Sequence, residues 1–265
     1  MVYITSSSNP TIKEIKSLYR RKERWEKKSF LVEGIKIVEE CIENNYPLSN
    51  IIFSEGLYTI RGGESLWEKI KDCGQLIKVS DKLYKEISDT ENPQGVMAIA
   101  RFKPNYIEEI DHIENPFLLL LDQVQDPGNM GTIIRTADAF GINGIIITEG
   151  CVDVYNPKVV RATMGSIFRV PTYHHSHGVE IIEKLKKKNI SIFSTSLEGD
   201  KFIQNVNFNQ PSLLIIGNES KGVSQYLEVL ADSLIKIPMV GEAESLNVAI
   251  ASSIIMYESM RQRIQ

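Results

Sequence analysis

The chain has 265 residues, of which 42% are hydrophobic and 24% are charged, and its formal net charge is −4 at pH 7. This composition is typical of a globular protein with one large domain or two modest ones. No apolar run approaches the length of a membrane span, which excludes an integral helical membrane protein, and the overall charge does not indicate a nucleic-acid binder.

The cysteines and the first residues bear on the compartment. Cys41, Cys73 and Cys151 are far apart and form no C-x-x-C pair, so we expect free thiols in a reducing environment. The opening stretch MVYITSSSNPTIKEIK has no apolar h-region, so we expect no secretory signal and a cytoplasmic location. YHHSHG has no Cys, Asp or Glu at ligand spacing beside its histidines, so we expect no metal site.

The first predicted helix lies in NPTIKEIKSLYRRKERWEKK, residues 9–28. Apolar residues recur at helical spacing from Ile12 to Tyr19, with Asn9 as the N-cap and Pro10 at the first helical position. Between Lys13 and Lys28 there are eight basic and three acidic residues. Either a solvated helix face or a phosphate-binding helix would account for this charge. The candidate RNA contacts are Lys13, Lys16, Arg20, Arg21, Lys22 and Arg24.

Strands and helices alternate over the rest of the first hundred residues. SFLVEGIKIVEECIENN predicts a strand that runs into a helix, and LSNIIFSEG, GQLIKVS and QGVMAIARF each predict a strand. We therefore expect a small α/β domain over residues 1–103. The polar, acidic stretch from Pro104 to Pro116 is the predicted linker, residues 104–116.

From Phe117 onward the alternation becomes regular, without an internal repeat. The predicted strands are FLLLLD, GIIIT, SIFSTS, SLLIIGNE and LIKIP, and the predicted helices are TIIRTADAF, PKVVRATMGSIF, VEIIEKLKKKN and SLNVAIASSIIMYESMRQR. Alternating βα units predict a mainly parallel, doubly covered sheet over residues 117–265. This half, counted from Pro104, has 13 basic and 19 acidic residues, so we expect most of its surface to face solvent.

The stretch LDQVQDPGNMGTIIRTADAFG follows the first of these strands. Gly128 and Gly131 flank Asn129, and Arg135 follows on the predicted helix. Glycine permits close backbone approach, and asparagine offers both a donor and an acceptor at a strand end, where open α/β sheets bind ligands. The alternative is a simple turn in which Arg135 pairs only with Asp138.

Two further clusters follow later strands. LLIIGNESKGVS places Glu219 after a strand, where it is a general base, an orienting acceptor or a cap of the next helix. In IKIPMVGEAESLNVAIASS, Ser245 is the predicted N-cap of a helix that begins near Leu246, with Asn247 in its first turn. Neither G-x-G-x-x-G nor G-x-x-x-x-G-K-[ST] occurs, which argues against dinucleotide and P-loop sites.

Taken together, these stretches resemble the motifs of the SpoU family of RNA ribose 2′-O-methyltransferases, in the SPOUT superfamily. DPGNMGTIIRTADAFG, IIGNESKGVS and IPMVGEAESLNVAIASSI are similar to motifs one, two and three, and NPKVVRATMGSIFRVP is similar to the intervening segment. The resemblance covers about Phe117 to Arg263. The first hundred residues resemble, more weakly, the family's substrate-binding domain, which is similar to a ribosomal-protein fold.

The resemblance implies a fold and a cofactor. The C-terminal parallel-sheet domain would contain a trefoil knot, an exception to the rule against knots, beside the smaller N-terminal α/β domain. S-adenosylmethionine would bind in the knot, and the protein would be a homodimer. A side chain at Gly217 or Gly222 would collide with the cofactor or the threaded chain. The implied cofactor-binding residues are Thr195, Leu197, Gly217, Gly222, Ile237, Met239 and Leu246.

The resemblance also implies methylation of a ribose 2′-hydroxyl of RNA. Arg135 would hold the adjacent phosphate or stabilise the developing alkoxide, because a guanidinium stays protonated in proteins. Glu219, Ser245 and Asn247 would orient Arg135 and the ribose, while Asn129 would fix the loop and contact the substrate.

The extra N-terminal domain favours ribosomal RNA as the substrate. A tRNA substrate and an antibiotic-resistance type of rRNA modification stay open. A non-catalytic RNA-binding or ribosome-assembly protein on the same fold is the alternative from another class, and a nicotinamide-dependent oxidoreductase is a more distant one.

Overall fold

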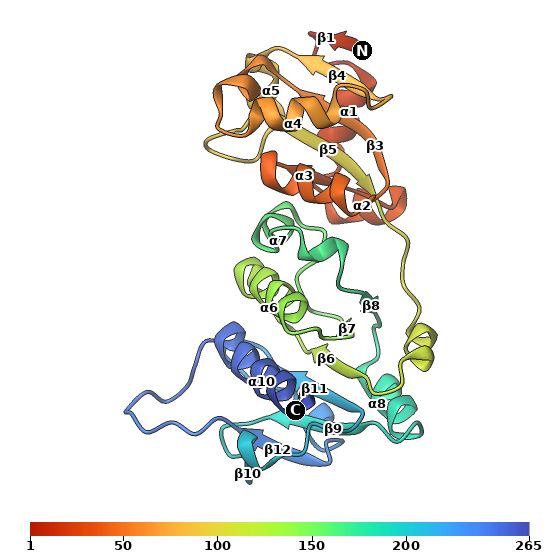
Figure 1. Ribbon diagram of the computed structural model, residues 1–265. Helices are drawn as coiled ribbons and strands as arrows, with labels where there is room; N and C mark the ends of the chain where they lie inside the picture. The colour runs from red at the N-terminus through yellow and green to blue at the C-terminus, as the bar shows by residue number, and fades with distance from the viewer. Residues whose placement is uncertain (265) are drawn as a thin grey trace. The chain divides into compact units, whose positions relative to one another are not determined.

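The computed structural model describes residues 1–264, and its residues group into two compact units (Figure 1). Unit 1 consists of Met1–Lys103 and Asp153–Phe168, and unit 2 consists of Pro104–Val152 and Arg169–Gln265. The segment 153–168 therefore packs with the first hundred residues, although the strand and helix pattern predicts it within the second domain. Within the described chain, no helix combines the length and the apolar character that crossing a membrane requires.

Unit 1 contains a mixed five-stranded sheet in the order β1-β4-β3-β5-β2. β1, β4 and β3 are parallel, and β5 is antiparallel to both β3 and β2. The four strands predicted from the sequence are present, whereas the short edge strand β1 was not predicted. The strands are β1 (Val2–Ile4), β2 (Ser29–Glu33), β3 (Leu48–Phe53), β4 (Leu76–Val79) and β5 (Val96–Arg101).

The helices of unit 1 are short. They are α1 (Pro10–Ser17), α2 (Arg21–Lys27), α3 (Ile35–Glu43), α4 (Gly63–Ile70), α5 (Asp81–Ile87) and α7 (Pro157–Ala162), with 3-10 turns at Glu55–Thr59 and Ser166–Phe168. The predicted start of α1 is confirmed, because the Asn9 side chain accepts the Thr11 N–H and Pro10 occupies the first turn.

The expected single helix over residues 9–28 is wrong, because the chain breaks between α1 and α2. Arg20 is extended, with φ −94° and ψ 131°. The carbonyls of Leu18 and Tyr19 accept hydrogen bonds from the Arg24 guanidinium, both at 2.9 Å. A side chain from the second helix therefore satisfies backbone acceptors at the break, which a period-based prediction does not register.

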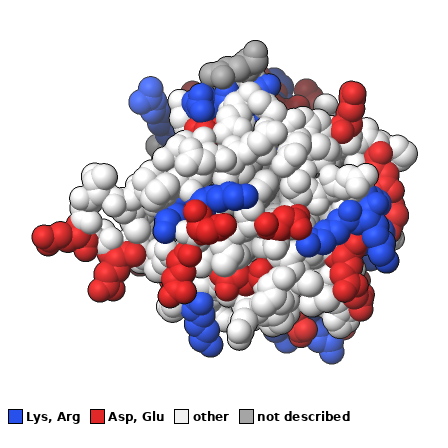
Figure 2. Space-filling view, turned by 90° about the horizontal axis from the view of Figure 1, so that it is seen from below, with Lys and Arg blue, Asp and Glu red and all other residues white. Residues whose placement is uncertain are grey.

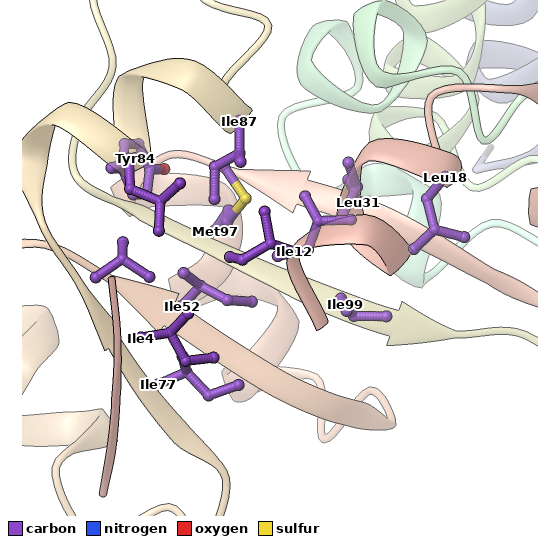
Figure 3. Close-up of a cluster of buried hydrophobic side chains, with 13 residues drawn as sticks. Ile4, Ile12, Leu18, Leu31, Ile52, Ile77, Tyr84, Ile87, Met97 and Ile99 are labelled. Atoms are coloured by element: carbon purple, nitrogen blue, oxygen red, sulfur yellow. The ribbon is translucent and has the colours of Figure 1, made fainter. Parts of the chain in front are cut away.

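One hydrophobic cluster of unit 1 lies between α1, α5 and the sheet (Figure 3). Ile12 and Ile15 of α1 are fully buried, as the helical spacing predicts. They pack in one cluster with Ile52 and Met97 from the sheet and Tyr84 from α5. This packing sets the position of α1, and so of the basic residues on its exposed side.

Unit 2 contains the predicted parallel sheet, with seven strands in the order β10-β12-β9-β11-β6-β7-β8. Every neighbouring pair is parallel. Phe117–Leu121 is buried along its whole length, as expected for a strand covered on both faces. β8 and β10 were not predicted. The strands are β6 (Phe117–Leu121), β7 (Gly144–Ile147), β8 (Thr172–His174), β9 (Ser191–Thr195), β10 (Lys201–Phe202), β11 (Ser212–Ile216) and β12 (Ser233–Lys236).

The helices of unit 2 include the two that carry predicted site residues. α6 (Pro127–Ala139) follows β6, and α10 (Val248–Arg263) ends the described chain. These two helices contact each other through Thr136 and Ser253, whose hydroxyls are 3.1 Å apart, and through the rings of Phe140 and Tyr257. The others are α8 (Gly178–Lys186), α9 (Gln225–Glu228) and the 3-10 helices η2 (Ile107–His112), within the predicted linker, and η4 (Ile203–Asn205).

The start of α10 and the state of the cysteines both bear on the sequence predictions. Ser245 as the N-cap of the last helix is wrong, because the Asn247 side chain accepts the N–H groups of Ala249 and Ile250, so the helix begins only at Val248. The expectation of free thiols is confirmed, since Cys41, Cys73 and Cys151 are all unpaired.

Candidate active site

The sheet order of unit 2 brings the predicted site loops to one edge. β12, β9, β11 and β6 are consecutive neighbours and run parallel, so the loops that follow them leave from the same side. In open parallel sheets this carboxyl edge is where ligands bind. Thr195 ends β9, Gly217 follows β11, and Ile237 follows β12. Residues that are distant in sequence thus converge on one edge.

Asn129 connects two of these loops to α10. Its amide nitrogen donates to Glu219 Oε1 at 3.1 Å, and its amide oxygen accepts from Asn247 Nδ2 at 3.0 Å. The Asn247 oxygen in turn caps α10. The three sequence motifs therefore meet in one chain of side-chain hydrogen bonds, and Asn129 is its middle member.

The Glu219 carboxylate holds the loop that precedes α6. It accepts the backbone N–H of Asp126 at 3.0 Å and, more weakly, that of Gln125 at 3.3 Å. Burial raises the pKa of Glu219, but the hydrogen bonds from Asp126, Asn129 and Gln125 outweigh that effect, so the net shift lowers its pKa. Glu219 is therefore an ionised acceptor in the folded protein.

Arg135 lies on α6 with an exposed side chain. The alternative in which Arg135 pairs only with Asp138 is wrong, because Asp138 accepts two hydrogen bonds from Arg169, at 2.8 and 2.9 Å. Within residues 1–264 the Arg135 guanidinium makes no ion pair or hydrogen bond. It is a charged donor group available to a ligand.

Glu219, Ser245 and Asn247 are expected to orient Arg135, but none of them contacts its guanidinium through a hydrogen bond or ion pair within residues 1–264. Glu219 and Asn247 bond to Asn129 instead. Ser245 is exposed and, among the described residues, its hydroxyl makes no hydrogen bond. The structure therefore brings Asn129, Glu219 and Asn247 together and leaves Arg135 and Ser245 outside that cluster.

Glycine is favoured at positions 217 and 222, after β11, for two different physical reasons. A Cβ on Gly217 would lie 2.1 Å from the backbone carbon of Gly222 and from the nitrogen of Val223. Gly222 has φ +70°, which L side chains rarely adopt, and open space where its Cβ would be. A close turn therefore requires glycine at position 217, and a left-handed backbone favours it at position 222.

The remaining candidate cofactor residues lie at the end of β9 or in the chain that follows β9 and β12. Thr195 Oγ1 donates to the Ile215 carbonyl at 3.1 Å, which joins β9 to β11. Leu197, Met239 and Leu246 are exposed apolar side chains, Leu197 by 63%. Exposed apolar side chains fit an adenosyl group, which needs an apolar cover. Within residues 1–264, no three His, Cys, Asp or Glu residues gather in a way that could hold a metal ion.

Two residues that support the site were not predicted. Asp122, directly after β6, accepts the Ser224 N–H at 2.7 Å, and Asn218 donates to the Gln123 carbonyl at 2.9 Å. Both tie the loop after β6 to the loop after β11. The signal that identified Glu219, a polar residue within three positions of the end of an apolar strand, is also present at Asp122 and Asn218.

The candidate RNA contacts in unit 1 differ in availability. Lys13 and Arg21 are exposed, whereas Lys16 pairs with Glu86 at 2.6 Å. Arg20 pairs with Glu23 at 3.3 Å, and Lys22 with Glu26 at 3.7 Å. Such exposed pairs are weak and can be exchanged for phosphate contacts.

Arg24 is not available as an RNA contact, which corrects the sequence prediction. Its side chain is 2% exposed and lies 2.5 Å from Asp153, which is 3% exposed. Trp25 Nε1 also donates to Asp153, at 3.2 Å. The buried carboxylate fixes the guanidinium inside unit 1.

The surface charge in Figure 2 is mixed. On the face drawn there, acidic and basic side chains are intermixed, so that face offers no continuous basic path.

Comparisons with known proteins agree with the motif geometry. Residues 116–257 match the model of the SpoU rRNA Methylase family, and residues 9–98 match the MRM3-like substrate binding domain. The chain belongs to the SpoU rRNA methylase family. The three motifs of the sequence all lie within the matched region of this SpoU-family chain.

Relatives of this SpoU-family chain align over nearly its whole length. The 23S rRNA (guanosine(2553)-2′-O)-methyltransferase of Bacillus subtilis is 30% identical, covering 97% of this chain and 98% of the relative. A 23S rRNA (uridine(2479)-2′-O)-methyltransferase of Streptomyces viridochromogenes is 32% identical, covering 93% and 88%. The crystal structure of the SpoU methyltransferase AviRb of that organism, in complex with the cofactor AdoMet, has a TM-score of 0.87 at 30% identity and covers 97% and 99%.

Proposed function

We propose that this SpoU-family chain transfers the methyl group of S-adenosylmethionine to a ribose 2′-hydroxyl of ribosomal RNA. The observation that carries the proposal is the hydrogen-bond chain from Glu219 through Asn129 to Asn247, which joins all three family motifs at the carboxyl edge of the sheet. Relatives similar over nearly the whole chain are named as 23S rRNA 2′-O-methyltransferases, and a similar structure contains AdoMet.

The chemistry asked of the protein is mainly orientation. S-adenosylmethionine, when bound, supplies a methyl group made electrophilic by its sulfonium. The protein holds the ribose 2′-oxygen in line with that methyl group, and orientation of this kind is worth about 7–11 kcal/mol. Arg135, exposed and unpaired within residues 1–264, binds the adjacent phosphate or stabilises the developing alkoxide.

Asn129 positions the site and retains one donor for the substrate. Its oxygen and one amide hydrogen are used by Asn247 and Glu219, which leaves one N–H. Glu219 keeps the loop before α6 in place through the Asp126 N–H. Ser245, in the loop between β12 and α10, is exposed and its hydroxyl makes no hydrogen bond within residues 1–264, so it contacts the ribose directly.

The cofactor is held by the backbone at three loops, with an apolar cover. Thr195 and Leu197 after β9, Gly217 and Gly222 after β11, and Ile237, Met239 and Leu246 after β12 provide these groups. The convergence of the three loops at one sheet edge supports this assignment. The exposed apolar side chains of Leu197, Met239 and Leu246 support it too.

Three features of assembly and location are part of the proposal. The C-terminal part contains the family's trefoil knot, and the protein is a cytoplasmic homodimer, with Ile250 and Tyr257 on the exposed side of α10 as apolar interface residues. Residues 1–103 bind RNA through a domain similar to a ribosomal-protein fold, 104–116 link it, and 117–265 carry catalysis. Residues 153–168 are the exception, since they pack in unit 1.

The test starts with calorimetric titration of the protein with S-adenosylmethionine, with NADH as control. We expect micromolar binding of S-adenosylmethionine alone, and transfer of a labelled methyl group to deproteinised ribosomal RNA, mapped as a 2′-O-methyl nucleotide. Absence of binding both with and without ribosomal RNA would overturn the enzyme proposal. Cofactor binding with transfer to tRNA alone would correct the substrate.

A further inference from the structure

A groove in unit 1 is bordered mainly by cations. It has a volume of about 510 Å³, and its lining includes Lys27, Lys28, Arg101 and Lys103, with Glu14 as its carboxylate. The apolar members of the lining are Phe102, which is buried, and Pro47, which is exposed. Four positive charges and one negative charge therefore face one concave surface. Of these cations, none is among the candidate RNA contacts on α1 and α2.

The backbone fixes these side chains side by side. Ser29 of β2 pairs with Arg101 of β5. The next pair along the ladder is Lys28 and Phe102, whose N–H donates to the Lys28 carbonyl at 3.0 Å. On the other side of β5, the Arg101 N–H donates to the Pro47 carbonyl at 2.8 Å. The end of an antiparallel pair thus places the segment that follows α2 beside the segment that leaves β5. The sheet thus sets Lys28 and Arg101 close together, and Lys103 lies two residues beyond the end of β5.

Three of the four cations have no carboxylate of their own. Lys27 is paired with Glu23 at 3.0 Å and donates to Ser17, whereas Lys28, Arg101 and Lys103 make no ion pair within residues 1–264. Elsewhere in unit 1, by contrast, Lys36, Lys69, Lys71 and Lys78 each pair with a glutamate. The groove is therefore a local concentration of unneutralised positive charge.

Lys28 occupies a backbone position that favours glycine. It ends α2 with φ 49° and ψ 44°, and its N–H donates to the Arg24 carbonyl. A non-glycine residue in this left-handed region costs about 1–2 kcal/mol. The chain thus bears a backbone cost at the position that sets this ammonium group at the groove.

We propose that this groove binds the phosphate backbone of the RNA substrate. The inference rests on the proposed function, because it names where that substrate is held. Ser29 and Ser49 already donate their hydroxyls to backbone carbonyls, so the lining offers charge rather than directed readout of bases. Contacts of this kind give affinity and register without sequence preference.

The test compares two triple variants of the full chain with equal change in charge. The groove variant is Lys28→Gln, Arg101→Gln and Lys103→Gln. The control variant is Arg61→Gln, Lys82→Gln and Lys85→Gln, which are exposed cations of unit 1 outside the groove lining. Binding of deproteinised ribosomal RNA is measured at several KCl concentrations, together with calorimetric binding of S-adenosylmethionine.

We expect the groove variant to raise the RNA dissociation constant about tenfold or more near 0.1 M salt, and to reduce the slope of log affinity against log salt by about 2 to 3. The control variant stays within about threefold of wild type, and both variants bind S-adenosylmethionine as wild type does. Equal losses of RNA affinity in the two variants, or none in the groove variant, would overturn the groove proposal.

Lys28→Gly separates binding from folding. Glycine accepts the left-handed backbone, so this variant should unfold at the wild-type temperature or above it and still bind RNA several-fold more weakly. Unchanged RNA affinity in this stable variant would contradict the role of Lys28. The proposed function fails separately: it is overturned if the wild-type protein binds ribosomal RNA with the groove dependence described but transfers no methyl group to it.

Discussion

The amide nitrogen of Asn129 lies 3.1 Å from Glu219 Oε1, although 90 residues separate the two along the chain. The same carboxylate accepts the Asp126 N–H, and its pKa is lowered by these hydrogen bonds, against the raising effect of burial. A general base is most effective when its pKa is near the working pH. We therefore assign Glu219 to positioning of the loop before α6, not to removal of the 2′-hydroxyl proton.

Glu219→Gln should slow methyl transfer while it leaves cofactor binding nearly intact. The glutamine places an N–H₂ group among donors, so one of the bonds to Asp126 or Asn129 is lost; a hydrogen bond to a charged group is worth about 1.5–3 kcal/mol. We expect kcat to fall about 10- to 100-fold. The matched control is Glu149→Gln, an exposed carboxylate of the same unit. An unaltered kcat for Glu219→Gln would remove Glu219 from the site.

The stability contributed by Glu219 should depend on pH in one direction. Since its pKa in the folded protein is below the ordinary value of 4.5, the ionised form stabilises the fold above that value. This contribution is lost as the pH falls through the lowered pKa. The difference in unfolding free energy between wild type and Glu219→Gln should be constant above about pH 5 and shrink below 4.5, as measured by urea titration. A difference that grows on acidification would contradict the assignment.

Arg135→Ala should abolish most methyl transfer, with S-adenosylmethionine affinity within a few-fold of wild type. The side chain is exposed and unpaired within residues 1–264, so the fold loses little when it is removed. Loss of a donor that stabilises developing charge costs about 10²–10³ in kcat. Arg135→Lys keeps the charge without the planar fork and should recover only part of the rate. Equal losses of cofactor affinity and rate would show that Arg135 holds the fold or the cofactor.

The two glycines after β11 should differ in sensitivity. Gly217→Ala forces a Cβ to within 2.1 Å of the Gly222 backbone, so the turn must open and the protein should lose several kcal/mol, about 3 or more. Gly222→Ala keeps open space and pays only for its φ of +70°, about 1 kcal/mol. Gly74→Ala, with nothing within 4 Å, is the control. Thermal unfolding of the three variants measures the loss of stability in each. A larger loss for Gly222→Ala than for Gly217→Ala would contradict the prediction.

Arg24→Ala should destabilise unit 1 strongly. It leaves Asp153 buried without its cation, and breaking a buried pair costs about 3–5 kcal/mol. Arg21→Ala, in the same helix and exposed, should change stability by less than about 0.5 kcal/mol. Chemical denaturation of both variants measures the two changes in unfolding free energy. If the two variants were equally stable but RNA binding fell only for Arg24→Ala, the buried assignment of Arg24 would be wrong.

Much of unit 2 could be predicted from sequence because its apolar runs are long and are closed by glycine or polar residues. The five residues of Phe117–Leu121 are all buried, and the strands predicted from SIFSTS and SLLIIGNE are its sheet neighbours or next neighbours. The two-residue strand Lys201–Phe202 could not be found in this way, because both residues are exposed and carry no periodic signal.

The candidate site was predicted as a set of residues rather than as a set of contacts. Asn129, Glu219 and Asn247 do meet, yet the sequence placed the helix cap at Ser245, since serine is as good a cap as asparagine by type. Arg24 was grouped with its exposed neighbours because a charge count cannot register an acidic partner 129 residues away. Tertiary partners of this kind have no local signature.

Residues 153–168 return to unit 1 after the chain has begun unit 2, and they bring Asp153 to Arg24. The N-terminal unit is therefore encoded in two separate stretches. A single genetic crossover after residue 103 would transplant Arg24 without its carboxylate and would bury an uncompensated charge in the recipient. Exchange of the N-terminal unit among such enzymes must then carry the second stretch as well, or replace Arg24 with an apolar residue.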